Sequence, residues 1–232
     1  WRATYASRGA DWRELVRRAR REAGAQHVSA AAVAVAGPVL DGEAALTNLG
    51  WRISSAELAQ ELGLARAPLL NDLEAAAHGL AVLAPAQLHS LQAGEERRGH
   101  RVLCSPGTGL GEAAAVWDGR RHLPLASEGG HATFAPLDDD DRALSDFLAE
   151  RHGHVSQERV LSGPGLVALY EFHHRRDGLD ESPALTRALA HGEGPAAITR
   201  AAHAGEELAR RTLTHFARLL GAEAANLALK FL

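Results

Sequence analysis

The first part of the chain alternates between helix-like spacing of apolar residues and short apolar runs. Residues 11–23 carry apolar side chains at helical spacing, with arginine and glutamate between them, which predicts an amphipathic helix. Residues 28–36 form an apolar run ended by Gly37-Pro38 and predict a buried strand. Within the next segment, Asp41-Gly42 is a pair typical of a tight hairpin turn.

The pattern then repeats as helix, strand and helix. Ser54 lies three residues before Glu57, as in a capping box, and Gly63 is placed to end the helix that follows. Leu69-Leu70 predicts a brief strand, after which Asn71-Asp72 begins a helix that continues to Leu80. Alternating strands and helices indicate α/β structure, so we expect residues 1–84 to form a small α/β domain.

Residues 85–100 are polar and irregular, and they predict a boundary between two domains. Beyond them, two strands flank a glycine-rich segment, and three helices follow. The predicted strands are 101–105 and 112–117, and the predicted helices are 142–150, 165–174 and 206–229, the last with a break at Gly221. We expect residues 85–232 to form a larger α+β domain, in which Asp138–Asp141 is a solvated loop and His173-His174 lies on a helix surface.

Composition and charge exclude several classes of protein. The chain has 232 residues, of which 46% are hydrophobic and 23% charged, as in ordinary globular domains. Its 25 basic residues are spread along the chain against 29 acidic ones, for a net charge of -4, so we expect no nucleic-acid partner. No apolar run is long enough to span a bilayer, so we expect no membrane partner. The single cysteine, Cys104, excludes an internal disulfide and favours a cytoplasmic location.

Both ends of the sequence predict that it is part of a longer protein. The chain begins at Trp1 and contains no methionine, and it stops in an apolar run, 226–232, without a polar tail. Removal of a start methionine together with chance is the simpler alternative. We expect that the chain is a fragment of a longer protein.

A glycine-rich segment, Gly107 to Gly111, is the first candidate site. Glycines allow successive backbone N–H groups to converge on a phosphate, because no Cβ blocks the approach, and Thr108 could add a hydroxyl donor. An ordinary turn is the alternative. The residues after Gly111 predict a strand, so neither a Walker nor a Rossmann arrangement fits well, and a phosphate-gripping hairpin between strands remains.

Three further groups of residues carry candidate chemistry. Asp72, after a short strand, could take a proton from an attacking hydroxyl, although Asn71-Asp72 also suits a plain helix cap. Glu128-Gly129-Gly130-His131 can fold tightly enough for Glu128 and His131 to face one small ligand; zinc is the alternative, but its usual partner ligands are missing. Glu158 is either a ligand-binding carboxylate or an exposed glutamate at a helix start.

The motifs occur in an order that resembles one known family. They are Ala36-Gly37-Pro38-Val39, Leu46-Thr47-Asn48-x-x-Trp51, Asn71-Asp72, Gly107-Thr108-Gly109-Leu110-Gly111, Glu128-Gly129-Gly130-His131 and Glu158-Arg159-Val160-Leu161-Ser162-Gly163-Pro164-Gly165-Leu166. This order is similar to that of the bacterial glucokinases, sugar kinases of the actin-like ATPase (ribonuclease-H-like) fold with two domains. The resemblance covers nearly the whole chain.

The resemblance implies ATP-dependent phosphorylation of glucose at its 6-hydroxyl, with Mg²⁺ bound through the nucleotide. It makes Asp72 the catalytic base and assigns sugar binding to five residues: Asn71, Glu128, His131, Glu158 and, as a weaker candidate, Asn48. It assigns the second phosphate loop to Thr108 and Gly109, together with Gly107 and Gly111. It also predicts no bound zinc, and since related kinases are often dimers we keep a homodimer as an expectation.

The resemblance is incomplete at both ends. Family members begin with a strand and an Asp-x-Gly-Gly-Thr phosphate loop, and they continue past the last predicted helix into a Gly-Gly segment that packs against adenosine. Neither motif occurs here, so we expect an incomplete fold, in which the small domain lacks its first strands and the large domain its C-terminal part, with impaired nucleotide binding. A non-catalytic hexose-binding or regulatory protein derived from a sugar kinase, and a kinase for another hexose such as mannose, stay open as alternatives.

Overall fold

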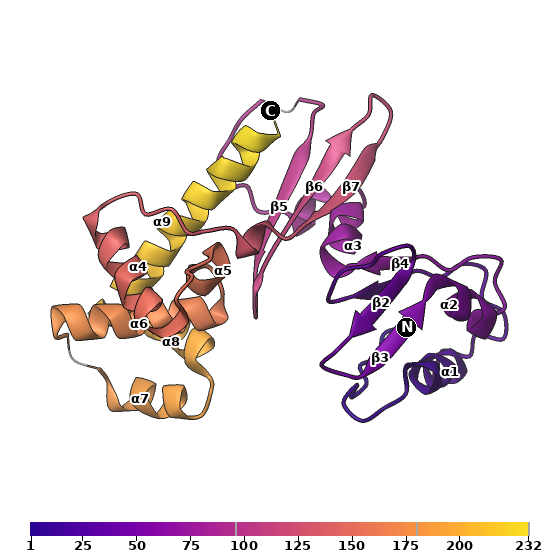
Figure 1. Ribbon diagram of the computed structural model, residues 1–232, viewed down its shortest axis with the longest axis horizontal. Helices are drawn as coiled ribbons and strands as arrows, with labels where there is room; N and C mark the ends of the chain where they lie inside the picture. The colour runs from indigo at the N-terminus through magenta and orange to yellow at the C-terminus, as the bar shows by residue number, and fades with distance from the viewer. Residues whose placement is uncertain (96, 180, 232) are drawn as a thin grey trace. The chain divides into compact units, whose positions relative to one another are not determined.

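The computed structural model describes residues 1–95, 97–179 and 181–231. The chain divides into two compact units, Trp1–Leu83 and Ala84–Leu232, which are described separately (Figure 1).

The first unit combines two small pairs of strands with three helices. β1 pairs in parallel with β4, and Val35 lies opposite Asn71, so the carboxyl ends of the two strands meet. β2 and β3 form an antiparallel hairpin. The elements are α1 (Trp12–Glu22), β1 (Val33–Val35), β2 (Glu43–Leu46), β3 (Trp51–Ser54), α2 (Ser55–Leu62), β4 (Leu69–Asn71) and α3 (Asp72–Gly79).

Local signals in the sequence account for the ends of these elements. The Asp11 side chain caps α1 by accepting from the Arg13 amide at 2.7 Å. Ser54 caps α2, and Gly63 ends it in a left-handed conformation with φ 68°, as predicted. Asp41 and Gly42 both have positive φ and join Leu40 to Glu43, which confirms the predicted turn. The predicted strand 28–36 is reduced to the three residues of β1.

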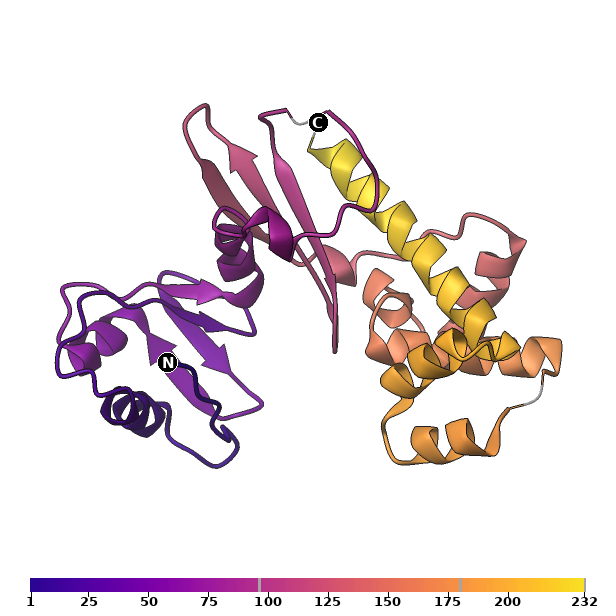
Figure 2. The same cartoon turned by 180° about the vertical axis from the view of Figure 1, so that it is seen from behind.

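The second unit packs helices beside a three-stranded antiparallel sheet, with strand order β5-β6-β7. α9 contacts β5 and lies beside it in both views (Figures 1 and 2). The elements are η1 (Pro85–Gln87), β5 (Arg101–Pro106), β6 (Leu110–Trp117), β7 (His122–Ser127), η2 (Gly129–His131), α4 (Asp139–His152), α5 (Gln157–Val160), α6 (Gly163–Asp177), α7 (Pro183–Ala190), α8 (Gly194–His203) and α9 (Glu207–Lys230).

Two apolar clusters stabilise the second unit. The first joins α4, α5, α6 and α9 to the start of β6, and Leu144, Leu161 and Leu169 are fully buried in it. The second joins α6 to α7, α8 and α9 around Tyr170 and Ile198. The first unit has a separate core around Leu58 and Ile53. The architecture is therefore α/β in the first unit and α+β in the second.

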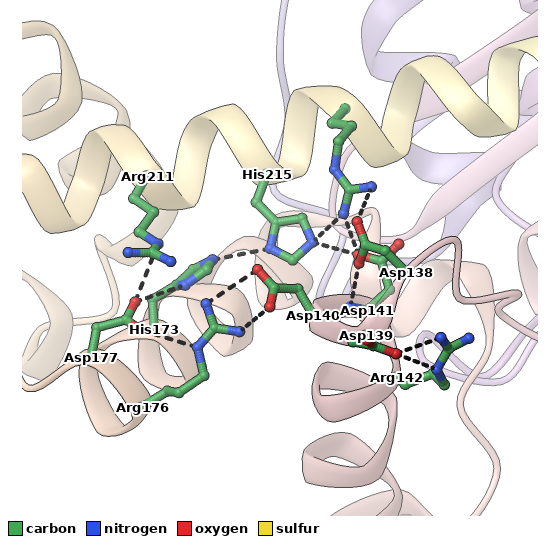
Figure 3. A network of polar contacts seen from close by, with 11 residues as sticks. Asp138, Asp139, Asp140, Asp141, Arg142, His173, Arg176, Asp177, Arg211 and His215 are labelled. Carbon is green, nitrogen blue, oxygen red and sulfur yellow. Dashed lines mark hydrogen bonds and ion pairs between the residues drawn. The ribbon is translucent and has the colours of Figure 1, made fainter.

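Several predictions for the second unit were wrong. Asp138–Asp141 is not a solvated loop, because Asp138 caps α4 and the helix begins at the next residue. Asp141 is 0% exposed, and its carboxylate is hydrogen-bonded to His215 and Arg218. His173 is only 2% exposed and bonds His215 rather than lying on the surface (Figure 3). α9 continues through Gly221 without a break, and α5, β7, α7 and α8 were not predicted.

Candidate active site

The glycine-rich segment is a hairpin turn between β5 and β6. Pro106 pairs with Leu110, and the Gly107 amide donates to the Gly109 carbonyl at 2.8 Å. Within the described part of the chain, the amides of Thr108 and Gly109 find no acceptor. Gly111 lies inside β6, opposite Ser105, so the turn is shorter than predicted. The remaining turn presents two unpaired N–H groups, which suits an anionic oxygen.

Glu158 lies directly against this turn. It sits in the first turn of α5, and its Oε2 accepts a hydrogen bond from the Leu110 amide at 3.0 Å. A Cβ added to Gly109 would come within 2.4 Å of the same oxygen. Glu158 lies at a helix start, as the alternative expected, but it is half-buried rather than exposed. Its carboxylate therefore has a fixed orientation, and Gly109 is the residue that leaves room for it.

The segment from Glu128 to His131 folds into the single 3₁₀ turn η2. The His131 amide donates to the Glu128 carbonyl at 3.0 Å, and the side chains stand 3.8 Å apart between His131 Nε2 and Glu128 Oε2. Gly130 packs so closely on the Leu110 carbonyl oxygen that an added Cβ would lie 2.1 Å from it. The two glycines thus allow a tight turn, and the Glu128 and His131 side chains point to solvent.

Backbone hydrogen bonds join these pieces into one site. The Gln157 amide, at the start of α5, donates to the Ala132 carbonyl just after η2 at 2.8 Å. The Gly163 amide, at the start of α6, donates to the Gly107 carbonyl at 2.7 Å. The second unit therefore gathers the glycine-rich turn, η2 and Glu158 around Leu110.

In the first unit, Asn71 connects the carboxyl ends of β1 and β4. Its Oδ1 accepts from the Leu73 and Glu74 amides at 2.8 and 3.3 Å, and its Nδ2 donates to the Gly37 carbonyl at 3.1 Å. Asn71 is thus the helix cap that the simpler interpretation predicted. Asp72 is the first residue of α3, and its carboxylate is exposed. The carboxyl ends of parallel strands are the usual place for ligands in α/β structures.

Asn48 lies in the turn between β2 and β3 and is exposed. It lines a largely apolar cavity of about 570 Å³ in the first unit, together with Thr47, Gly37 and Pro38. Asn48 therefore lines the same cavity as Gly37, whose carbonyl accepts the hydrogen bond from Asn71.

Glu112 belongs to this site but was not among the candidate residues predicted from the sequence. This glutamate lies in β6, is 1% exposed, and borders Gly129 of η2. The signal was present, because Glu112 is the one charged residue in the otherwise small and apolar stretch 110–116. Buried carboxylates are rare unless they are paired.

The described residues contain no group of three or more His, Cys, Asp or Glu side chains placed to hold a metal ion. Among the helices of the described ranges, none is long and apolar enough to cross a membrane.

Comparison with known proteins decides the family. The glucokinase family model matches residues 3–232. This chain belongs to the glucokinase family. The glucokinase of Chromohalobacter salexigens is 37% identical over 217 residues, which cover 93% of this chain and 65% of that protein. The chain thus spans just under two thirds of the length of this curated relative.

Solved structures of the glucokinase family agree with the assignment. A glucokinase from an Antarctic psychrotroph matches with a TM-score of 0.81 and 32% identity, covering 99% of this chain and 69% of that one. The glucokinase of Balamuthia mandrillaris, solved in complex with glucose, matches with a TM-score of 0.69 at 20% identity, which supports the fold alone. It covers 94% of this chain and 65% of that one.

Proposed function

We propose that the protein phosphorylates glucose at the 6-hydroxyl with ATP, giving glucose 6-phosphate. The observation that carries the proposal is the site in the second unit, where Glu158, η2 and the glycine-rich turn are held together around Leu110 in a chain of the glucokinase family. The fixed Glu158 carboxylate, with the Glu128 carboxylate and the His131 imidazole on η2, suits a polyol, because directional hydrogen bonds discriminate between hydroxyl patterns better than an apolar pocket does.

In this proposal Asp72 is the general base. Its exposed carboxylate at the start of α3 can accept the proton of the sugar 6-hydroxyl as the oxygen attacks phosphorus. The sugar-binding residues are Glu128, His131, Glu158, Asn71 and Asn48. Asn71 already uses its side chain to cap α3 and to hold Gly37, so it contributes to the sugar site by fixing the ends of β1 and β4 and through its remaining N–H.

In this proposal the nucleotide phosphates bind at the turn from Gly107 to Gly109, and Gly111, in β6, follows that turn. The unpaired Thr108 and Gly109 amides and the open space around Gly107 fit an incoming phosphate. Mg²⁺ bound to the nucleotide would neutralise the phosphate charge, and we propose that it is held through ATP rather than by a cluster of protein carboxylates.

The first test is turnover. The purified protein is assayed with Mg-ATP and glucose, with mannose and other hexoses in parallel, by coupling ADP formation to NADH oxidation, which reports turnover of every hexose alike. We expect glucose turnover with a raised KM for ATP, since nucleotide binding is expected to be impaired, and Asp72→Asn should lower kcat about 10²- to 10⁴-fold while changing glucose affinity only a few-fold. Glucose binding without turnover of any hexose would contradict the proposal and support a non-catalytic hexose-binding protein.

The second test is binding. Isothermal titration of glucose into this chain should give saturable binding that Glu158→Ala weakens more than Asp72→Asn does, because Glu158 is fixed beside the turn. Absence of binding by a folded chain would overturn the assignment of Glu158. We also propose a cytoplasmic location, and a homodimer that sedimentation velocity would reveal.

A further inference from the structure

Glu112 occupies the centre of the three-stranded sheet in the second unit. It pairs with Cys104 of β5 on one side and with Ser127 of β7 on the other. The residue is 1% exposed, and its Oε1 is buried with no hydrogen-bond partner in the described part of the chain. A charged carboxylate in this position would lack the compensation that buried charges need.

A second carboxyl group faces it from α9. Glu223 is 4% exposed and lies on α9, which packs beside β5, and its charge acts on the Glu112 carboxyl group. On α9 itself, Asn226 Nδ2 donates to Glu223 at 3.0 Å, and Lys230 Nζ lies 3.9 Å from its other oxygen. The charged and titratable groups around Glu112 are therefore Glu223 and Lys230 from α9 and Cys104 from β5, while β7 contributes the Ser127 hydroxyl.

This environment favours one shared proton. Burial raises the pKa of Glu112, and the neighbouring Glu223 raises it further, while the more distant Lys230 opposes the shift. Two facing carboxyl groups in a dry interface are stable when one of them is protonated and donates to the other. The protonated Glu112 can supply that donor to Glu223.

The other oxygen of Glu112 lies directly beneath the candidate sugar-binding segment. A Cβ added to Gly129 would fall 1.9 Å from Glu112 Oε2 and 3.0 Å from its carboxyl carbon. The Gly129 amide is bonded to Ser127 Oγ at 2.9 Å, so the backbone is held between Glu112 and Ser127. The Glu112 carboxyl group thus packs against Gly129 at the start of η2, and Glu128 and His131 extend from the two ends of that turn.

We propose that Glu112 is a positioning residue of the sugar site: buried between β6 and α9 and protonated beside Glu223, it packs against Gly129 and so places Glu128 and His131 for the sugar hydroxyls. The proposal rests on the glucose phosphorylation proposed above. Loss of the shared proton leaves two repelling carboxylates between β6 and α9. Repulsion moves the Glu112 side chain, and the turn that rests on it loses its position.

The experiment compares the kinetics of Glu112→Gln with those of the parent protein between pH 5 and 9. Glutamine has the same shape as protonated Glu112, can donate to Glu223, and does not titrate. We expect glucose KM of the parent to rise as pH increases through the raised pKa of Glu112, and this rise to be absent in Glu112→Gln. At each pH, kcat of the variant at saturating glucose should stay within two-fold of the parent's. Glu112→Ala should raise glucose KM at least ten-fold at neutral pH. Glu150→Gln, on the exposed side of α4, is the matched control and should keep the parent profile.

A second measurement does not depend on glucose. Because the pKa of Glu112 is raised in the folded state, its contribution to stability is present at low pH and is lost as pH rises from its ordinary value through the raised one. Urea unfolding of Glu112→Gln should lack this decline in stability with rising pH. A Gln variant with the parent's pH profile in both KM and unfolding would overturn the proposal. If Glu112→Gln and the parent show the same pH dependence of unfolding, the shared proton alone is contradicted. If the parent turns over no hexose, the proposed function is contradicted.

Discussion

At the scale of single residues, two neighbouring glycines in the turn between β5 and β6 have different surroundings. A Cβ at Gly109 would lie 2.4 Å from Glu158 Oε2, whereas a Cβ at Gly107 would meet no atom within 4 Å. Neither has a positive φ, so alanine is compatible with the backbone at both positions. The two substitutions therefore separate the sugar side of the turn from its phosphate side.

We predict that Gly109→Ala raises glucose KM about ten-fold or more. The new methyl group displaces the Glu158 carboxylate, which loses its hydrogen bond from the Leu110 amide, and a charge-assisted bond of this kind is worth roughly 1.5–3 kcal/mol. Steady-state kinetics with each substrate varied in turn would show the effect on glucose KM.

Gly107→Ala is the matched substitution, and it should leave glucose KM within two-fold while raising KM for ATP. Its methyl group enters open space beside the Thr108 and Gly109 amides, which is the space proposed for a phosphate. Equal effects of the two alanines on both substrates would contradict the division of the turn.

Sequence reasoning found residues whose chemistry is visible locally and missed one whose role depends on burial. Glu158 and His131 stood out because short glycine-containing motifs surround them. Glu112 did not, because its importance comes from Glu223, which is 111 residues away and reaches it only when α9 packs beside β5. A one-dimensional pattern does not contain that contact.

At the scale of elements, a buried polar chain joins α4, α6 and α9 (Figure 3). His215 Nε2 bonds Asp141 at 2.7 Å, His215 Nδ1 bonds His173 Nε2 at 3.0 Å, and His173 Nδ1 lies 3.3 Å from Asp177. Burial alone would raise the pKa of Asp141, but bonds from His215, the Leu137 amide and Arg218 hold it below its ordinary value. Asp177 forms ion pairs with Arg176, on α6, and with Arg211, on α9.

We predict that protonation of His173 destabilises the protein in acid. Burial, and then the neighbouring His215, lower the pKa of His173 from 6.5 to about 4. The folded state therefore binds this proton less readily than the unfolded state, so the contribution of His173 is present above pH 6.5 and is lost as pH falls toward 4. The loss amounts to about 3 kcal/mol at most. Urea unfolding between pH 7.5 and 4.5 measures it.

His174 supplies the control for this measurement, because it is adjacent in the chain and exposed. His173→Gln should flatten the pH dependence of the unfolding free energy, although it lowers stability at neutral pH, whereas His174→Gln should follow the parent curve. If both variants keep the parent slope, His173 does not titrate as its surroundings imply.

We also predict that Gly221→Ala stabilises α9. Gly221 lies within the helix and is exposed, and an added Cβ would meet no atom within 4 Å. Alanine in an exposed helix interior is favoured over glycine by about 0.5–1 kcal/mol. The free energy of unfolding should rise by about this amount, and the urea midpoint should rise with it. An unchanged or lower midpoint would indicate that α9 needs flexibility at this residue.

The elements themselves were predictable where the signals are local. Ser54 and Gly63 determine both ends of α2, and the Asn71 cap determines the start of α3. β7 was missed because Pro124 interrupts its pattern, and proline is accepted there because β7 is an edge strand. The break expected at Gly221 does not occur, since packing along α9 outweighs the weak helix propensity of one glycine.

At the scale of the whole molecule, the two units have separate cores, and the polar segment that precedes β5 belongs to neither core. The first unit buries Leu58 and Ile53, and the second buries Leu144 and Leu169. Apart from the short η1, the described residues between α3 and β5 form no helix or strand, and Arg97 and Arg98 are exposed there. Irregular composition was enough to predict this segment, whereas the residues that build each core became clear only from the packing.

We predict that trypsin cleaves first at Arg97 or Arg98 and that the products keep their secondary structure. Among the described residues, Arg97 pairs with the exposed Glu95, whereas the exposed pair Arg120-Arg121 has both amides hydrogen-bonded to Asp118. A proteolysis time course read by mass spectrometry identifies the first cut, and circular dichroism before and after it tests whether the units stay folded. The double variant Arg97→Gln, Arg98→Gln should remove the early cut and leave the later ones. A loss of helical signal that accompanies the first cut would show that each core depends on the other, and the two units would then unfold as one.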